Sequence, residues 1–261
     1  MLQDAHLHPQ DIDDPAEAGR LLAGAARRGI GRLIVNATSP EDWDKVVASA
    51  AANTSVVPFF GLHPWFVAQA KPGWDGALEQ LLAAHRAGVG EIGLDGSRSR
   101  PDLEIQKAVF SRQLDIAFKL DRPAAIHCVH AWGELLDILR SRSPARGSFM
   151  IHLFSGSKEV LAELLKMGAY ISFSLGIEDG ASPKAREAYM LTPPAQLLLE
   201  TDYPYIPGRR DAAGAPGADE YYARLNRLYD CAARIQGMDR ATLETTVWDN
   251  GTTFLHGIDI G

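Results

Sequence analysis

The first residues of the chain, MLQDAHLH, combine an acid with two histidines. Asp4, His6 and His8 alternate with Ala5 and Leu7. Because alternation is the period of a β-strand, we expect the three polar side chains to share one face. Such a face meets either water or an ion that takes nitrogen and oxygen ligands, as Zn²⁺ and Mn²⁺ do.

Further histidines and acids stand at the ends of other short apolar stretches. They are His63 in GLHPW, Glu91 and Asp95 in GEIGLD, His127 in AAIHC, His152 in MIHLF, and Glu200 and Asp202 in LLLETD. The carboxyl ends of parallel strands meet at one rim of a barrel, which is where barrel enzymes hold their active sites. One ion would not use all these side chains, so the set predicts two ions that share a bridging carboxylate. Glu200 is expected to be a buried structural acid and not a ligand.

Short apolar stretches alternate with longer amphipathic ones along the whole chain. The predicted strands are 2–8, 32–37, 55–63, 88–95, 123–128, 148–154, 169–174 and 196–202. The predicted helices are 15–29, 39–53, 73–88, 101–121, 131–142, 157–168 and 182–191, followed by 219–237 and 239–255. Eight such units predict an α/β fold with parallel strands. The length of 261 residues is close to the roughly 250 of a (β/α)8 barrel, so we expect a single TIM-barrel domain over 1–261 with extra C-terminal helices. An open doubly wound sheet is the alternative.

The composition narrows the class of protein. Hydrophobic residues make up 46% and charged residues 23%, as in a soluble globular protein, and the net charge is −7. The electrostatic field of a protein with this negative net charge does not attract nucleic acid. Any phosphate must therefore be bound locally, by an ion or a small basic cluster. Two distant cysteines, Cys128 and Cys231, predict no disulfide framework. No signal peptide or membrane span is apparent, and we expect a cytoplasmic protein.

The motifs DAHLH, GLHP, GEIGLD, IHC, HLFSGS, SFSLG and ETDYPY occur in this order. Together they resemble the TatD family of metal-dependent hydrolases, a branch of the amidohydrolase superfamily. The similarity runs from Asp4 to the DNGTTFL segment near the C-terminus. It implies a TIM barrel and metal-dependent DNase activity.

The resemblance also implies a role for each ligand. The implied ligands are His6, His8 and Asp202 for the first ion, His127 and His152 for the second, and the bridging carboxylate of Glu91 for both. Asp202 would also handle the proton of the nucleophilic water. His63 and Asp95 would stand behind the ligands or face the substrate. The residue types do not choose among Zn²⁺, Mn²⁺ and Mg²⁺.

The chain departs from the family pattern after the fifth predicted strand. The family usually has His, any residue, Arg and an acid, whereas this chain reads HCVHAW. Val129 takes the arginine position, and His130 takes the acid position and is a candidate substrate-binding donor. A guanidinium there would neutralise phosphate charge in the transition state, so its absence weakens the nuclease interpretation and leaves the metal prediction intact.

Two loops are candidates for substrate contact. Arg98 and Arg100 either clamp a phosphate or lie in a solvated loop. The Gly-, Pro- and Ala-rich stretch at 206–218 is predicted to be a mobile loop able to cover a site. Trp65 and Phe66 are expected to pack in a loop rather than to stack on a base.

Three functions follow from these observations. The first is a two-metal phosphodiesterase, a DNase-like enzyme that acts at nucleic-acid ends. The second keeps the metals but hydrolyses an amide, ester or lactone in a small molecule, and the missing arginine favours it. The third is an inactive metal-binding scaffold, against which the full ligand set argues. None of the three implies a membrane or an obligate protein partner.

Overall fold

Strands and helices alternate along the chain in a computed structural model that describes residues 1–97, 100–142, 147–205 and 217–258. The strands are β1 (Leu2–Leu7), β2 (Ile30–Asn36), β3 (Val56–Phe60), β4 (Gly88–Asp95), β5 (Ala124–Val129), β6 (Phe149–Ile151), β7 (Tyr170–Phe173) and β8 (Leu197–Leu199). The helices are α1 (Pro15–Ala25), α2 (Trp43–Ala52), α3 (Trp74–Ala84), α4 (Leu103–Lys119), α5 (Trp132–Arg140), α6 (Lys158–Lys166), α7 (Pro183–Leu191), α8 (Ala218–Gln236) and α9 (Arg240–Phe254). Arg98 and most of the predicted loop at 206–218 lie outside the described residues, so the expectations for them stay predictions.

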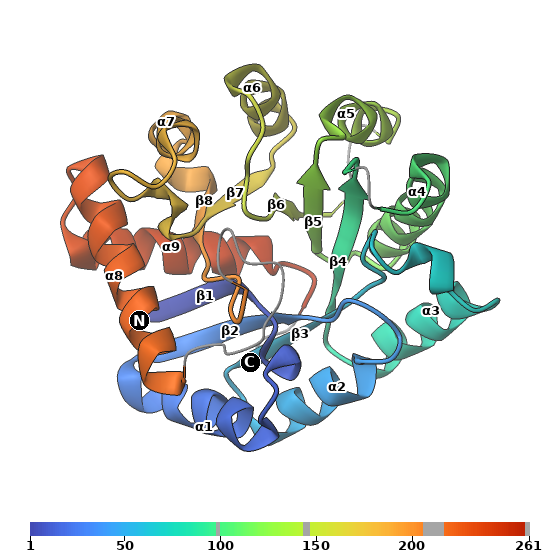
Figure 1. The fold of residues 1–261 in the computed structure, drawn as a ribbon, viewed down its shortest axis with the longest axis horizontal. Coiled ribbons are helices and arrows are strands. Elements are labelled where there is room, and N and C mark those ends of the chain that lie inside the picture. The colour runs from blue at the N-terminus through green and yellow to red at the C-terminus, as the bar shows by residue number, and fades with distance from the viewer. Residues whose placement is uncertain (98–99, 143–146, 206–216, 259–261) are drawn as a thin grey trace.

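The eight strands form one parallel sheet in the order β1 to β8, and the helices surround it (Figure 1). The sheet is closed between β8 and β1 by backbone contacts just past the strand ends. Leu7 forms a parallel bridge with Tyr203, His8 N donates to Tyr203 O at 2.6 Å, and Asp202 N donates to His6 O at 3.0 Å. The predicted (β/α)8 barrel is therefore confirmed, and the open sheet is excluded.

The last helix closes the amino-terminal end of the barrel. Asn250 on α9 donates from Nδ2 to the carbonyl oxygens of Pro194 and Leu197, at 2.6 and 2.8 Å, where β8 begins. Phe254 at the end of α9 packs against Tyr170, the first residue of β7. The side chains of this inner apolar cluster include Ala5, Ile34, Met150 and Leu198 from the strands and Leu255 and Ile258 after α9. The polar side chains of the predicted metal site therefore lie at the opposite rim, at the carboxyl ends of the strands.

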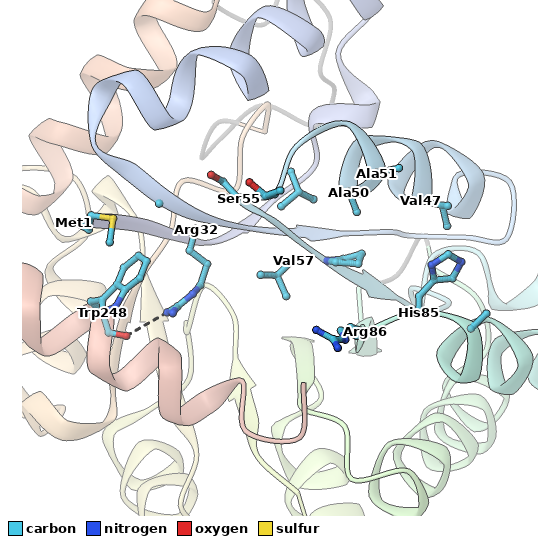
Figure 2. Close-up of a pocket in the computed structure, with 15 residues that line it drawn as sticks. Met1, Arg32, Val47, Ala50, Ala51, Ser55, Val57, His85, Arg86 and Trp248 are labelled. Carbon is cyan, nitrogen blue, oxygen red and sulfur yellow. Dashed lines mark hydrogen bonds between the residues drawn. The ribbon is translucent and has the colours of Figure 1, made fainter. Parts of the chain in front are cut away.

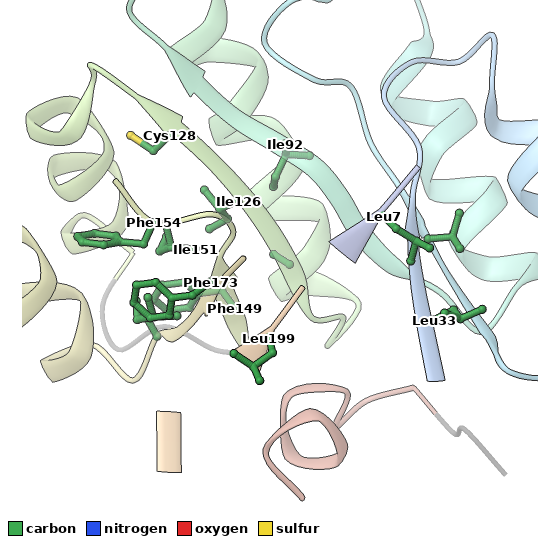
Figure 3. Packing of buried hydrophobic residues seen from close by; sticks show 14 of the residues in the cluster. Leu7, Leu33, Ile92, Ile126, Cys128, Phe149, Ile151, Phe154, Phe173 and Leu199 are labelled. Carbon is green, nitrogen blue, oxygen red and sulfur yellow. The ribbon is translucent and has the colours of Figure 1, made fainter. Parts of the chain in front are cut away.

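A larger apolar cluster lies between the strands and the surrounding helices (Figure 3). All eight residues of β4 are buried, as expected for a parallel strand covered on both sides. Ile92 and Leu94 join the outer cluster, whereas the neighbouring Glu91 and Asp95 are buried polar residues. The period of the strand thus delivers two acids to the barrel interior and rim. No helix in the described part of the chain is long and apolar enough to cross a membrane.

The alternation predicted for β1 is wrong at Asp4. The pairing of β1 with β2 is irregular between Asp4 and Leu7, so the strict period of two is lost there. The Asp4 carboxylate accepts hydrogen bonds from Thr201 Oγ1 at 2.6 Å and from Tyr221 Oη of α8 at 3.1 Å. Asp4 therefore ties β1 to the segment after β8 and to the helix layer, and it does not share a site with the two histidines.

Gly93 in β4 provides a test of how tightly β4 and β5 pack. Its φ is 141°, and a Cβ built there would overlap the backbone carbonyl oxygen of His127. We expect Gly93→Ala to lower the free energy of unfolding by about 3 kcal/mol or more, because both backbone strain and overpacking oppose the methyl group. Urea unfolding followed by circular dichroism measures this.

The matched control is Gly76→Ala on α3, where a Cβ has no neighbour within 4 Å. Alanine is the better helix former, so this variant should be as stable as the parent or more stable by about 0.5–1 kcal/mol. Equal unfolding free energies for the two variants would contradict the packing described for β4 and β5.

Candidate metal centre

Glu91 of β4 lies at the centre of a buried cluster of histidines, and its side chain is 4% exposed. Its Oε2 is 3.3 Å from Nε2 of His6 and 3.3 Å from Nε2 of His8. These two Nε2 atoms are 3.0 Å apart. Asp202 Oδ1 lies 3.6 Å from His8 Nε2 and 3.9 Å from His6 Nε2. Two imidazole nitrogens and two carboxylate oxygens therefore point at one small region.

The other oxygen of Glu91 faces a second group of imidazoles. Its Oε1 lies 3.2 Å from Nε2 of His63, 3.0 Å from Nδ1 of His127 and 3.1 Å from Nε2 of His152. His127 is on β5, whereas His63 and His152 stand just after β3 and β6. One carboxylate thus has a different nitrogen group at each oxygen, which is the geometry that a bridging ligand requires. His63, which the resemblance placed behind the ligands or facing the substrate, lies within this group.

Two of the histidines are oriented by hydrogen bonds on their far side. His8 Nδ1 is 2.7 Å from the carbonyl oxygen of Asn36, so Nδ1 carries the proton and Nε2 faces the cluster. His152 Nδ1 is 3.1 Å from Glu200 Oε1, and Ser172 Oγ donates to Glu200 Oε2 at 2.5 Å. Such partners fix the ring and the tautomer of a metal-ligating histidine. Glu200, kept out of the ligand set on sequence grounds, lies behind His152.

Asp95 stands behind His127 in a similar way. Its Oδ2 is 3.6 Å from His127 Nε2, accepts Trp65 Nε1 at 2.6 Å and is 3.3 Å from Arg100 Nε. Its Oδ1 accepts the backbone N–H of Ser97 at 2.9 Å. The guanidinium of Arg100 lies 3.5 Å from the centre of the Trp65 ring. The sequence did not predict this Trp65–Asp95–Arg100 cluster, because no local spacing signals a contact between loops that follow different strands.

Val129 and His130 have different surroundings. Val129 ends β5 and pairs in register with Asp95 of β4. His130 follows with a φ of 53° and is exposed. The groups of possible metal ligands among the described residues include neither of the two. His130 therefore lies outside the cluster, and its predicted contact with substrate stays a prediction.

The charge of Glu91 is balanced by the imidazoles around it. Burial raises the pKa of Glu91, but nearby His63, His152 and His6 outweigh it and hold the pKa well below the usual range. Burial likewise opposes the charged form of His8 and His152. Hydrogen bonds to Asp202 and Glu91 nevertheless raise the pKa of His8, and the charges of Glu91 and Glu200 raise that of His152, both well above 6.5. Burial and nearby His152 lower the pKa of His6 to about 3. Protons on His8 and His152 thus occupy the place that a cation would take.

A large cavity in the structure lies away from the histidine cluster around Glu91. A cavity of about 750 Å³ lies at the other end of the barrel, where Met1, Arg32, His85 and Trp248 line it (Figure 2). Arg32 donates to the carbonyl oxygen of Trp248 at 3.2 Å and stacks on its ring. None of the ligand candidates lines this cavity, so the donor atoms identify the site.

Metal binding should release protons. Because the pKa values of His8 and His152 are raised well above the usual value of a histidine, these imidazoles must lose protons before they bind a cation. Apparent metal affinity should therefore fall as the pH is lowered from 8 to 6. Calorimetric titration of Zn²⁺ or Mn²⁺ in buffers with different ionisation enthalpies measures the released protons. Binding heats that are the same in every buffer would contradict the charge balance described here.

Comparison with known proteins agrees with the metal centre described above. The family model described as "TatD related DNase" matches residues 3–256. The uncharacterized metal-dependent hydrolase YjjV of Escherichia coli K12 is 32% identical over 232 residues, which cover 85% of this chain and 86% of the relative. The 3′-5′ ssDNA/RNA exonuclease TatD of Shigella flexneri serotype 5b is 27% identical over 240 residues, covering 91% and 92%.

The fold agrees with a solved structure of one of these relatives. The crystal structure of E. coli YjjV, a TatD homolog, superposes with a TM-score of 0.86 at 28% identity and covers 97% of both chains. The sequence match and the fold match both extend over nearly the whole chain, and the buried His, Glu and Asp groups supply the donors that a metal-dependent enzyme needs. The chain belongs to the TatD family and is a metal-dependent hydrolase.

Proposed function

We propose that this enzyme is a two-metal phosphodiesterase that removes nucleotides from the ends of single-stranded nucleic acid. The observation that carries the proposal is the position of Glu91, whose two oxygens each face a separate group of imidazoles. Relatives named 3′-5′ ssDNA/RNA exonuclease support the choice of substrate.

The donor set fits two divalent ions. In this proposal His6, His8 and Asp202 would hold the first ion, His127 and His152 would hold the second, and Glu91 would supply one carboxylate oxygen to each. His63 is a further donor beside the second ion, because its Nε2 lies within 3.2 Å of the same Glu91 oxygen. Imidazole nitrogen with carboxylate oxygen suits Zn²⁺ and Mn²⁺, whereas Mg²⁺ prefers oxygen ligands and keeps several waters.

Bound ions supply two things in this chemistry: they lower the pKa of water to about 7 and neutralise charge on a phosphoryl oxygen. The protein supplies the proton acceptor. Asp202 is 17% exposed, whereas Glu91 is 4% exposed, so Asp202 is the acid that an entering water can reach. Asp202 takes the proton of the attacking water and returns it to the leaving oxygen. No serine or cysteine nucleophile is needed.

A second candidate function keeps the same ligands and changes the bond. Val129 stands where the family pattern has an arginine, so the protein itself contributes no guanidinium there for phosphate. An ester, amide or lactone needs none, and this favours a small-molecule hydrolase. A metal-loaded enzyme that leaves phosphodiesters intact and hydrolyses a panel of esters or lactones would select this alternative.

Glu91→Gln tests the bridging role. An amide has one acceptor oxygen and no charge, so it cannot serve two cations. We expect turnover of a 5′-labelled single-stranded oligonucleotide and of bis(p-nitrophenyl) phosphate to fall by roughly 10³-fold or more. Bound metal, measured by atomic emission, should fall below two ions per chain. Glu79→Gln is the matched control, since Glu79 makes only surface ion pairs with Arg112 and Lys119 among the described residues. Unchanged turnover in Glu91→Gln would refute the proposal.

Glu200→Gln tests the acid behind His152. The amide keeps the size of the side chain but loses the charge that raises the pKa of His152. We expect metal affinity to fall about 10- to 100-fold, as is usual when the partner of a ligating histidine is changed. Turnover should return at saturating metal, which a folding defect would not allow. Affinity equal to the parent would show that Glu200 is only a packing residue.

A further inference from the structure

A cavity of about 260 Å³ opens directly beside the metal centre, and both His127 and His152 line it. The rest of its wall comes from the ends of β5, β6 and β7 and from α7. The apolar side chains in this wall are Cys128, Val129, Leu153, Phe154, Phe173, Ile177 and Ala185. Figure 3 shows Cys128, Phe154 and Phe173 near one another at these strands. A group held in this cavity would adjoin the ligands proposed for the second ion.

The wall offers almost nothing to an anion. Among the described residues that line it, none is Asp, Glu, Lys or Arg. Its hydroxyls are those of Ser155, Ser174 and Ser182, of which the last two accept the backbone N–H groups of Gly176 and Ala185. The described wall is therefore mostly apolar, with the two histidines and three serine hydroxyls as its polar side chains.

Val129 explains why the cavity is apolar. It lines the wall at the position where the family pattern places an arginine. An arginine side chain there would bring a guanidinium into the same space and make it suited to a phosphate. The valine removes that charge and leaves a surface that gains from contact with apolar groups.

We propose that this cavity binds an uncharged aromatic ring carried by the substrate beside the scissile bond. The ring is either a nucleobase or the aryl group of a small phosphodiester, since both present a flat apolar face. Phe154 and Phe173 give the wall aromatic surface, which favours a ring over a flexible chain. This inference rests on the proposed hydrolysis of phosphodiesters and names the part of the substrate that sets specificity.

The test narrows the cavity and compares substrates that differ in one group. Ala185→Leu on α7 adds bulk at the wall. Gly176→Ala is a milder second variant, because its Cβ would lie 3.8 Å from Ser174 Oγ and 3.9 Å from Ala185 Cβ, an ordinary contact. The matched control is Ala83→Leu on the exposed side of α3. The substrates are O-methyl, O-phenyl and O-thymidine-5′ esters of S-(2,2,2-trifluoroethyl) phosphorothiolate, which share one leaving thiol that contains no ring.

The parent enzyme should prefer a ring-bearing ester to the methyl ester. Ala185→Leu should lower kcat/KM about tenfold for that ester, mainly through KM, and less than about twofold for the methyl ester. Loss on the thymidine ester alone identifies a base-binding cavity, and loss on the phenyl ester alone identifies an aryl-binding one. Equal loss on all three esters, or no loss on any, would overturn the inference.

A binding measurement separates this inference from the proposed function. If the parent hydrolyses none of the diesters, the proposed function fails. The cavity is then still tested by calorimetric titration with phenyl phosphate and methyl phosphate. The parent should bind phenyl phosphate about tenfold more tightly, and Ala185→Leu should abolish the difference. Equal affinities in the parent would overturn the cavity's role whatever the reaction is.

Discussion

A carboxylate inside a protein is stable only beside positive charge or hydrogen-bond donors, and Glu91 obeys this constraint with imidazoles alone. Five of them surround its two oxygens at 3.0–3.3 Å. Burying the Glu91 carboxylate costs free energy unless protons on the histidines or bound cations balance its negative charge. Bound cations can therefore replace those protons. The parallel strands surround Glu91, and each strand, or the segment that follows it, contributes or supports one donor at the rim of the barrel.

The histidines hold their positions through a second set of contacts. The carbonyl of Asn36 orients His8, Glu200 orients His152, and Asp95 stands behind His127. Asn36 and Asp95 lie on strands that neighbour β1 and β5, whereas Glu200 follows β8 and reaches His152 past Ser172 of β7, so the packing of the barrel fixes the donor directions. The apolar plug formed by the end of α9 adds rigidity from the other end of the barrel.

Much of this could be predicted from the sequence, because strand period and strand ends are written in local patterns. The eight strands, the barrel and the histidines at its rim follow from them. Local patterns failed where the backbone departs from its regular period, as between Asp4 and Leu7. They also failed at the start of the second helix, predicted from residue 39. There the Asp42 carboxylate binds the N–H groups of Thr38 and Ser39 in a turn, and the helix begins at Trp43. The Trp65–Asp95–Arg100 cluster depends on loop geometry, which the sequence does not encode locally.

The seam between β8 and β1 has a consequence for how this enzyme acquires its activity. The backbone groups that join the two strands include those of His6, His8 and Asp202, whose side chains also point at the proposed position of the first cation. Closure of the barrel between β8 and β1 therefore also brings these donors together. A ribosome-bound chain that still lacks β8 and Asp202 has only two of these three donors, so the candidate centre is complete only when the two ends of the polypeptide have met.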